Sequence, residues 1–393
     1  MAGNAFTNVA LAFAVLDLTD SKADLGYVLA AQMVPLVVFM LVGGIWADRL
    51  PRHQVMVASN VVNGLVQLTT AALLLTGEAR IWQLIVLSAL GGTSFAFFFP
   101  ASTGIVPQTV PPESLQSANA LLRLGVNATR IGAAALAGLV VGLTSPGTGI
   151  AVDGVSFFLA ASLVGAMRIP ANLKLEARNF LGELKEGWRE FTSRTWLWAI
   201  VLQFGFVNAV VSGTENVLGP AVAKAHLGGA TAWGLLLTAM SVGLIVGGLV
   251  VLRFRPRRIL LAATLGYLLS IAFPLGLADP VPLIALMALA LIAGIGNEVF
   301  GVLWDTAMQQ EISQEKLSRV SSYDALGSFA LIPLGLAAAG PIADAVGTRE
   351  TFLGAAAISL VATLAVLLSR SVRTLERRVV VERREASSAE GAG

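Results

Sequence analysis

Cysteine is absent from the 393-residue sequence, and histidine occurs only twice, at His53 and His226. Without cysteine the chain forms no disulfide bond and no thiolate metal site. The two histidines are far apart in sequence, and neither has neighbours at the spacing of a metal-binding cluster. A phosphate-binding G-x-x-x-x-G-K-[ST] loop is also missing, which argues against ATP-driven pumping by this chain alone. We therefore expect no metal ion and no cofactor.

Charged residues are scarce as well, at 13% of the chain. A soluble globular protein contains about 25%. Hydrophobic residues make up 56% of the sequence, and the mean hydropathy is +0.78. A soluble protein of this size would need a more polar surface to stay dispersed. The composition therefore predicts a polytopic membrane protein that is surrounded by the lipid bilayer and has no nucleic-acid partner.

Twelve apolar runs, separated by short polar breaks, account for most of the chain. Most runs are long enough to cross the roughly 30 Å hydrocarbon core of a bilayer as helices. The first begins at Met1 and ends near Leu18, so we expect a first helix that is cut short at its N-terminus. The runs cover residues 3–18, 25–47, 54–76, 81–103, 115–143, 149–168, 196–221, 231–252, 259–278, 281–303, 317–342 and 350–369.

Lysine and arginine alternate in abundance from one break to the next. The breaks after even-numbered runs, together with the C-terminal tail, contain 20 of the 26 Lys and Arg residues, whereas the breaks after odd-numbered runs contain four. Cytoplasmic loops of membrane proteins carry an excess of Lys and Arg. The pattern therefore predicts a multi-pass protein of the cell membrane with a cytoplasmic C-terminus.

The longest break, residues 169–195, divides the chain into two halves. We expect residues 1–168 to form one six-helix half and residues 196–369 the other. The break has apolar residues at helical spacing among Lys and Arg, which predicts an amphipathic helix lying in the cytoplasmic interface. The charged tail, residues 370–393, is expected to be disordered.

A modest internal repeat supports this division. The halves match at an offset of 202 residues, where the fourth and tenth runs pass into the fifth and eleventh. Parallel six-helix repeats around a site at the bilayer midplane are one established plan for transporters. The identical pairs are Gln108 with Gln310, Glu113 with Glu315, Leu115 with Leu317, Leu124 with Leu326, and Gly125 with Gly327.

Three segments resemble the major facilitator superfamily. Residues 43–53, GGIWADRLPRH, follow the second run and resemble its loop motif, roughly G-x-x-x-D-R-x-x-R. Residues 130–138 resemble a degraded antiporter motif of drug exporters, and residues 302–335 resemble the branch that includes macrolide-efflux and enterobactin-export proteins. The resemblance implies an all-α bundle of 12 transmembrane helices in two pseudo-symmetric halves, which transports small molecules and is not an enzyme. We expect a monomer.

The sequence departs from the family pattern in two places that bear on mechanism. The fifth-run motif lacks the proline that is usual in drug antiporters, so the direction of transport stays open. The family's helix-4 arginine, often implicated in proton coupling, is missing, and residues 88–92 read SALGG instead.

The resemblance assigns a gating role to Gly44, Asp48, Arg49 and Arg52. A carboxylate at the end of one helix can accept hydrogen bonds from the N-terminus of a neighbouring helix. Arginines can clamp carboxylates across the interface between the halves. Breaking such contacts would accompany rocking between conformations. The alternative is a basic loop that merely follows the positive-inside rule.

Charges deep in the membrane cost about 2.5–3.5 kcal/mol each on insertion scales and are functional candidates. Glu298, with Asn297 beside it, and Arg130 are expected deep in the tenth and fifth helices, and Glu215 near the outer end of the seventh. The family architecture places helices 1, 4, 7 and 10 along the cavity, which favours Glu298 and then Glu215. Glu298 either carries a proton or substrate cation, or it forms a structural pair, for which Arg130 is the candidate.

Other residues have a plainer expected role. Asp153 falls near the outer end of the sixth helix, where water can reach it, and Asp305 and Asp324 fall towards cytoplasmic helix ends. The phenylalanines at residues 95 and 97–99 could stack on an apolar substrate, but four in five positions face all sides of a helix and mostly meet lipid or neighbouring helices.

The leading functional hypothesis is proton-coupled export of small amphipathic molecules by alternating access. Import or facilitated diffusion of a specific metabolite is the second. A polytopic membrane enzyme is disfavoured because neither histidine has the neighbours that a base at a membrane face would need. A transport-inactive sensor would be distinguished only by a flux assay.

Overall fold

The computed structural model describes residues 2–47, 51–109, 125, 136–167 and 180–377, and the regular structure in these ranges is helical. An isolated β-bridge joins Arg258 to Glu376. The expected all-α fold is therefore confirmed. The first set of helices is α1 (Ala2–Thr19), α2 (Lys22–Ala47), α3 (Arg52–Thr76), α4 (Ile81–Thr109) and α6 (Pro146–Gly165), with helical residues also at 136–143.

The second set begins with the amphipathic helix α7. Its members are α7 (Phe180–Ser193), α8 (Thr195–Gly213), the π-helix η2 (Thr214–Leu218), α9 (Gly219–Val222), the π-helix η3 (Ala223–Leu227), α10 (Ala230–Arg253), α11 (Ile259–Tyr267), the 3-10 helix η4 (Leu268–Ile271), α12 (Ala272–Ala278), α13 (Leu283–Glu311), α14 (Gln314–Phe329), α15 (Ile332–Val346), α16 (Thr348–Val366) and α17 (Arg370–Thr374).

Among the described residues, ten helical segments are long and apolar enough to cross a membrane. Helix α1 contributes a shorter apolar stretch, Val9–Thr19. The fifth expected run is described only at residue 125 and residues 136–143. The count of twelve spans is therefore not confirmed in full, although every other expected run has its helix.

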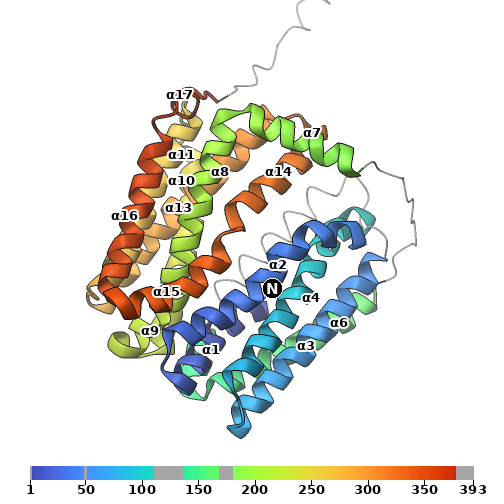
Figure 1. The fold of residues 1–393 in the computed structure, drawn as a ribbon, viewed down its shortest axis with the longest axis vertical. Helices are drawn as coiled ribbons and strands as arrows, with labels where there is room; N and C mark the ends of the chain where they lie inside the picture. The colour runs from blue at the N-terminus through green and yellow to red at the C-terminus, as the bar shows by residue number, and fades with distance from the viewer. Residues whose placement is uncertain (1, 48–50, 110–124, 126–135, 168–179, 378–393) are drawn as a thin grey trace, which may run out of the picture.

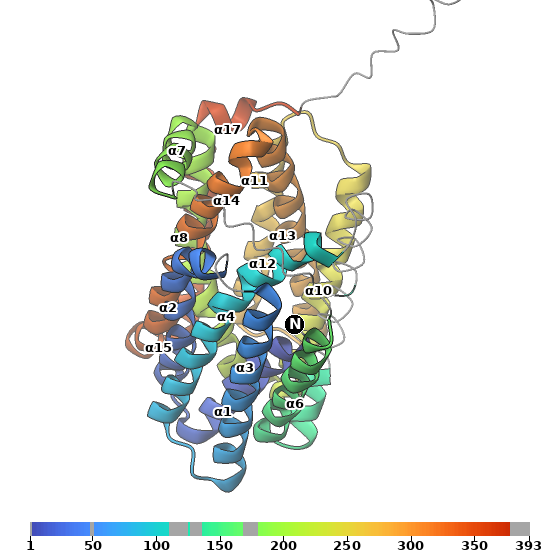
Figure 2. The same ribbon diagram turned by 90° about the vertical axis from the view of Figure 1, so that its right-hand side faces the viewer.

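The helices form two bundles that stand side by side (Figures 1 and 2). In the N-terminal bundle, α3 packs against α4 and α6, α2 against α4, and α1 against α6. In the C-terminal bundle, α13 packs against α10 and α11, and α8 against α14, α15 and α16. Glycines set these close approaches, since a Cβ at Gly213 of α8 would overlap the backbone of Gly335 of α15.

Helix α7 lies across the end of the C-terminal bundle against α14 (Figure 1). Trp188 and Phe191 on its apolar face contact Tyr323 of α14 with tilted rings, whose centroids lie 5.4 and 6.0 Å from that of Tyr323. On its polar face, Glu190 accepts hydrogen bonds from Arg194 at 2.7 Å and from Lys316 at 2.9 Å. The end of the molecule that carries α7 is called the α7 end below.

The described contacts between the bundles lie towards the opposite end, which we call the outer end. Two pairs of helices meet there closely. A Cβ at Gly26 of α2 would overlap the backbone carbonyl of Leu336 of α15, and one at Gly340 of α15 would overlap Ala23. On the other side, a Cβ at Gly138 would lie 2.8 Å from Gly234 of α10. These two glycine-lined contacts form the outer seam.

Candidate functional site

The loop motif between α2 and α3 lies mostly outside the described residues. Asp48 and Arg49 fall there, and Gly44 lies near the end of α2. Arg52 is the first residue of α3 and is half-buried. The gating assignment therefore stays a prediction.

Glu298 and Asn297 lie next to each other on α13 and turn towards different neighbours. A Cβ at Gly247 of α10 would lie 2.8 Å from the Cβ of Glu298, so the Glu298 side chain leaves α13 over the small surface of Gly247 and Gly248. The carboxamide oxygen of Asn297 accepts a hydrogen bond from Ser270 of η4 at 2.9 Å. Both residues thus face helices of their own bundle. Arg130, the expected partner of Glu298, is outside the described residues.

Glu215 lies in the π-helix η2, and its expected position was wrong. The sequence placed it near the outer end of a helix that stops at residue 221, but the helical segment continues through α9 and η3 to Leu227. Glu215 is therefore twelve residues inside the outer end, well within the membrane-spanning segment Thr195–Leu227. The sequence misled because Lys224 and His226 look like loop residues.

The Glu215 side chain is half-buried and makes no hydrogen bond or ion pair with any residue that the structure describes. Single π-helical turns within α-helices are frequently found at functional sites. Tyr267 of α11 lies within electrostatic range of this carboxylate. A partly exposed carboxylate in a transmembrane helix can hold a proton or attract a cationic substrate.

An aromatic cluster fills the C-terminal bundle on the α7 side of Glu215. Phe204 of α8 lies 4.3 Å from Phe300 and 4.9 Å from Tyr267, as measured between ring centroids. Trp304 continues the cluster, at 6.1 Å from Phe300 and 5.6 Å from Trp196. No local sequence pattern indicates this cluster, because its members come from three separate helices, α8, α11 and α13.

Asp324 is also held inside the C-terminal bundle. The indole Nε1 of Trp304 donates to its carboxylate at 3.2 Å, and Ser328 donates at 3.4 Å. Asp324 is half-buried, whereas Asp305 is exposed as expected for a residue near a helix end. Helix α14 thus places the Asp324 side chain against Trp304 of α13.

Asp153 differs most from its expected position. The sequence predicted a carboxylate near water, but only 1% of this α6 residue is exposed. Thr7 of α1 donates to its Oδ2, and Gln67 of α3 donates to the same oxygen at 3.2 Å. Ser156 donates to Oδ1 at 3.3 Å. Helices α1 and α3 cover Asp153, and the sequence alone does not reveal which helices pack on α6.

Ion pairs cross the outer seam, and each bundle contributes one lysine to them. Lys22 at the start of α2 contacts Asp344 of α15 at 3.1 Å and the hydroxyl of Thr348 at 3.2 Å. Lys224 of η3 contacts Asp17 and Asp20 of the N-terminal bundle at 3.1 and 3.3 Å. Lys224 also donates to the backbone carbonyl of Leu16 at the end of α1. These lysines, which the sequence analysis treated only as loop charges, clamp the two bundles together.

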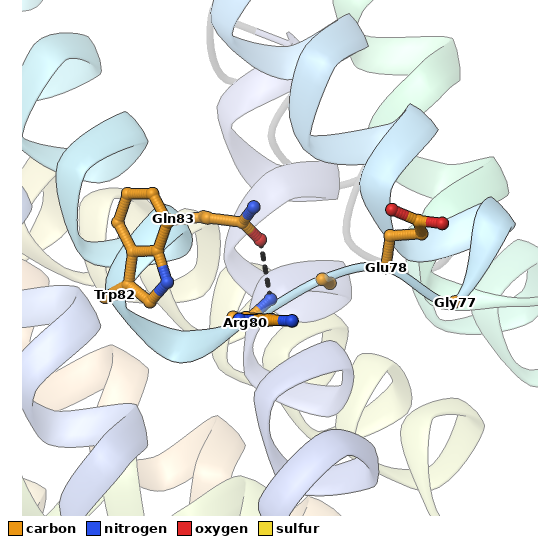
Figure 3. Close-up of a pocket in the computed structure, with 6 residues that line it drawn as sticks. Gly77, Glu78, Arg80, Trp82 and Gln83 are labelled. Carbon is orange, nitrogen blue, oxygen red and sulfur yellow. Dashed lines mark hydrogen bonds between the residues drawn. The ribbon is translucent and has the colours of Figure 1, made fainter.

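Two surface pockets at the outer end contain none of the predicted site residues. The α3–α4 turn encloses a hollow of about 380 Å³ lined by residues 77–80, Trp82 and Gln83. Figure 3 shows the Gln83 side chain turned back to the Arg80 backbone N–H, which donates to it at 2.8 Å. The second hollow, of about 480 Å³, lies between residues 226–227 and 280–283. A pocket made by one or two tight turns provides no path through a membrane.

A metal centre has no support in the described part of the chain, where no three His, Cys, Asp or Glu side chains come together. The described spans hold single carboxylates, and lysine clamps join the two bundles at the outer seam.

Comparison with protein families gives two matches that together span the chain. A family model described as transmembrane secretion effector matches residues 1–279, and one described as major facilitator superfamily matches residues 204–391.

Curated relatives match over almost their full length. The multidrug efflux pump Tap of Mycolicibacterium fortuitum is 27% identical over 387 residues, which cover 94% of this chain and 93% of the pump. Macrolide efflux protein A of Streptococcus pyogenes is 23% identical over 384 residues, which cover 95% of this chain and 94% of that protein.

Solved structures share the fold. The nucleoside transporter NupG superimposes with a TM-score of 0.72 at 13% identity, covering 93% of this chain and 96% of NupG. A bacterial homologue of the iron transporter ferroportin, solved in an inward-facing state, gives a TM-score of 0.69 at 17% identity, covering 93% of this chain and 95% of the homologue.

Proposed function

Because the chain belongs to the major facilitator superfamily, we propose that it exports small amphipathic molecules from the cell in exchange for protons, by alternating access. The observation that carries alternating access is the outer seam, where two glycine-lined helix contacts and two lysine clamps join the bundles at one end. Bundles joined at one end can rock about a central site, as in transporters built from two repeats.

The orientation follows from the basic residues. Helix α7, the arginines of residues 253–258 and the start of the tail all lie at the α7 end. We place this end in the cytoplasm because basic loops stay inside. The C-terminus is then cytoplasmic, the outer seam closes the external side, and the conformation faces inward. The division into halves at residues 1–168 and 196–369 is part of the same proposal.

Export of amphipathic molecules is supported by the relatives, two of which are named as multidrug and macrolide efflux proteins. Within this chain, Glu215 is a carboxylate on a helix of the cavity-lining set, without a partner among the described residues. A group of this kind in a low-dielectric cavity attracts a cationic centre strongly. Glu215 is therefore our first choice for contact with a positively charged substrate.

The remaining predicted residues keep their proposed roles. Gly44, Asp48, Arg49 and Arg52 would form the inner gate, and Asp48→Asn should then slow transport without reducing the amount of folded protein. Glu298 either carries a proton or is held in a structural pair, with Arg130 as the candidate partner. Transport by Glu298→Gln that keeps its full rate and pH dependence would reject the carrier role.

The test is drug accumulation in cells that lack their main exporters, with a cationic dye and a panel of macrolides, with and without a protonophore. We expect expression of this chain to lower accumulation in a protonophore-sensitive way. Glu215→Gln should weaken export of the dye more than that of neutral compounds. The matched control is Glu78→Gln, which changes an exposed carboxylate in the α3–α4 turn. Unchanged accumulation of every compound would reject broad drug export.

Import of a specific metabolite is the second candidate. It is favoured by the fifth-run segment starting at Arg130, which lacks the proline usual in drug antiporters. Protonophore-sensitive uptake of a metabolite, together with unchanged drug accumulation, would support this alternative over export.

A further inference from the structure

Asp153 is a buried carboxylate that the proposed transport cycle does not yet use. It is the only charged residue of the span Pro146–Gly165, and it lies seven residues inside the outer end of α6. Only 1% of the residue is exposed. Placing a carboxylate at this depth in a membrane costs free energy, so such a residue is a candidate functional site by default.

Its hydrogen-bonding shell comes from three helices. Thr7 of α1 and Gln67 of α3 both donate to Oδ2, and Ser156 of α6 itself donates to Oδ1. Gln67 also donates to the Thr7 hydroxyl at 2.8 Å, so the three side chains form one connected network. Both carboxylate oxygens accept hydrogen bonds, as an ionised carboxylate requires when it is removed from water.

Charged side chains are distant on every described element that packs on Asp153. Helix α3 has none between His53 and Glu78, and α1 has none before Asp17, ten residues beyond Thr7. Helix α10, which contacts α1, is charged only at its last residue, Arg253. Arg123 and Arg130 of the fifth run lie outside the described residues. The other cationic group is the amine at the start of the chain, before α1.

The hydrogen-bonding network around Asp153 can accept a proton but not a metal ion. Oδ2 accepts from Thr7 and Gln67, and Oδ1 from Ser156, whose hydroxyl also donates to the Asp153 backbone carbonyl at 2.8 Å. The hydrogens of these donors point at the carboxylate and would repel a metal ion. A proton needs no extra space. Bound to Oδ2, it becomes a donor in its own right, and the Thr7 hydroxyl must then accept from Asp153 instead of donating to it. Protonation therefore rearranges the contact that fastens α1 to α6.

Helix α1 connects this network to the outer seam. Thr7 lies in its middle, and the Leu16 carbonyl and Asp17 at its outer end contact Lys224 of the other bundle. The ten residues between Thr7 and Asp17 span about 15 Å of continuous helix. A change in how Asp153 holds Thr7 is thus passed directly to a helix that takes part in closing the outer seam.

We propose that Asp153 is a proton-binding site that controls the inward–outward equilibrium through Thr7 and α1. The inference rests on the proposed proton-coupled transport and assigns its proton to the N-terminal bundle. The ionised form holds Thr7 and Gln67 and favours the closed outer seam seen here. The protonated form loosens α1 and favours opening of the seam.

The absence of cysteine allows a test that needs no substrate. Ala166→Cys at the α7 end of the N-terminal bundle and Leu368→Cys at the same end of the C-terminal bundle lie at exposed positions and can be spin-labelled. We expect the distance distribution between the labels, measured in lipid nanodiscs, to change sigmoidally with pH. Asp153→Asn should remove this pH dependence.

Two further variants separate titration from structural damage. Asp153→Glu should restore a pH response with a displaced midpoint. Thr7→Val removes one donor to the ionised carboxylate and should move the midpoint to higher pH. Its matched control is Thr70→Val. Thr70 is also buried and lies one turn from Gln67 on α3, and its hydroxyl donates only to the Val66 carbonyl, at 2.8 Å. The control should keep the original midpoint.

Several outcomes would overturn the proposal. It is wrong if the parent protein shows no pH response, or if Asp153→Asn keeps the parent midpoint. It is also wrong if adding residues before Met1 abolishes the response, because the terminal amine would then be the titrating group. Failure of drug export with an intact pH response would instead reject the substrate class and leave the Asp153 site standing.

Discussion

The two bundles each bury a carboxylate within a span, but they treat it in opposite ways. Asp153 in the N-terminal bundle is sealed from water and accepts hydrogen bonds from three side chains. Glu215 in the C-terminal bundle is half-buried and has no hydrogen-bonding partner among the described residues. A sealed carboxylate can exchange only a proton, whereas an open one can meet a larger cation. This asymmetry supports our proposal that one bundle carries the coupling proton and the other contacts the substrate.

Local backbone structure explains part of this difference. Asp153 lies on a regular α-helix whose neighbours supply donors at matching depth. Glu215 lies in a π-helical segment, where the extra residue per turn interrupts the regular packing of side chains on adjacent helices. The duplicated architecture therefore does not imply duplicated chemistry.

Replacing each carboxylate by leucine should give the largest contrast. Asp153→Leu leaves the buried Thr7 hydroxyl without its acceptor, at a cost of about 1–3 kcal/mol, whereas Gln67 keeps its bond to Thr7. Glu215→Leu strands no donor and should leave stability unchanged or slightly raised. Thermal unfolding of the purified protein in detergent would compare the two variants. Equal melting temperatures would show that the Asp153 network adds nothing to stability.

The second-largest contrast is expected in the rates at which cysteines at positions 153 and 215 react with a thiol reagent. In the cysteine-free background, Glu215→Cys should react with a water-soluble thiol reagent roughly tenfold or more faster than Asp153→Cys, because reactivity requires an exposed thiolate. Mass spectrometry of the labelled protein measures both rates. Comparable labelling of both positions would contradict the sealed character of Asp153.

Crowding the outer seam should change access to one carboxylate only. Gly26→Ala places a methyl group against the Leu336 backbone, and overpacking of this kind costs about 1–3 kcal/mol. The bundles should part at the outer end, and an impermeant reagent added to cells should label Glu215→Cys faster. Gly354→Ala on α16, where nothing lies near the added atom, is the control. Faster labelling in the control as well would disconnect the effect from the seam.

The helices could be predicted from the sequence, but the burial of individual side chains could not. Apolar runs of about 20 residues must be helical in a bilayer, whatever their neighbours are, so the spans could be read directly. The end of the seventh helix was misread because Lys224 and His226 signal a loop, whereas Lys224 in fact reaches the end of α1. That contact joins residues 208 positions apart, and no local pattern encodes it.

The same reason explains the misplacement of Asp153. Its partner Thr7 is 146 residues away, so burial depends on how α1 and α3 pack on α6 rather than on the sequence around Asp153. Asn297 and Glu298 were correctly expected within a span, but the directions in which they face depend on Ser270 and on the glycines of α10. Identities of candidate residues could be predicted, and their partners could not.

Removing the lysine clamps should act in the same direction as crowding the seam, with a smaller effect. Lys22 and Lys224 are partly exposed, and such pairs contribute about 0.2–1 kcal/mol each. Lys22→Met combined with Lys224→Met should therefore increase labelling of Glu215→Cys only a few-fold and leave Asp153→Cys protected. High salt should mimic the change in the parent protein and have no further effect on the double variant.

The smallest effect is expected at the α7 end, away from both carboxylates. Hydrogen bonds from Arg194 and then Lys316 hold the pKa of Glu190 below its ordinary value of 4.5. A depressed pKa means that the pairing stabilises docked α7 above pH 4.5 and is lost as the pH falls through the lower, folded value.

Fluorescence of Trp188, which contacts Tyr323, should report the release of α7 only in acid. Because six other tryptophans contribute to the signal, the measurement compares the parent protein with Trp188→Phe. Glu190→Gln should weaken docking near neutral pH by about 1 kcal/mol at most and leave no acid transition at α7. An α7 signal that instead changed in parallel with the label distances would tie this helix to Asp153 and remove the separation between the two ends of the molecule.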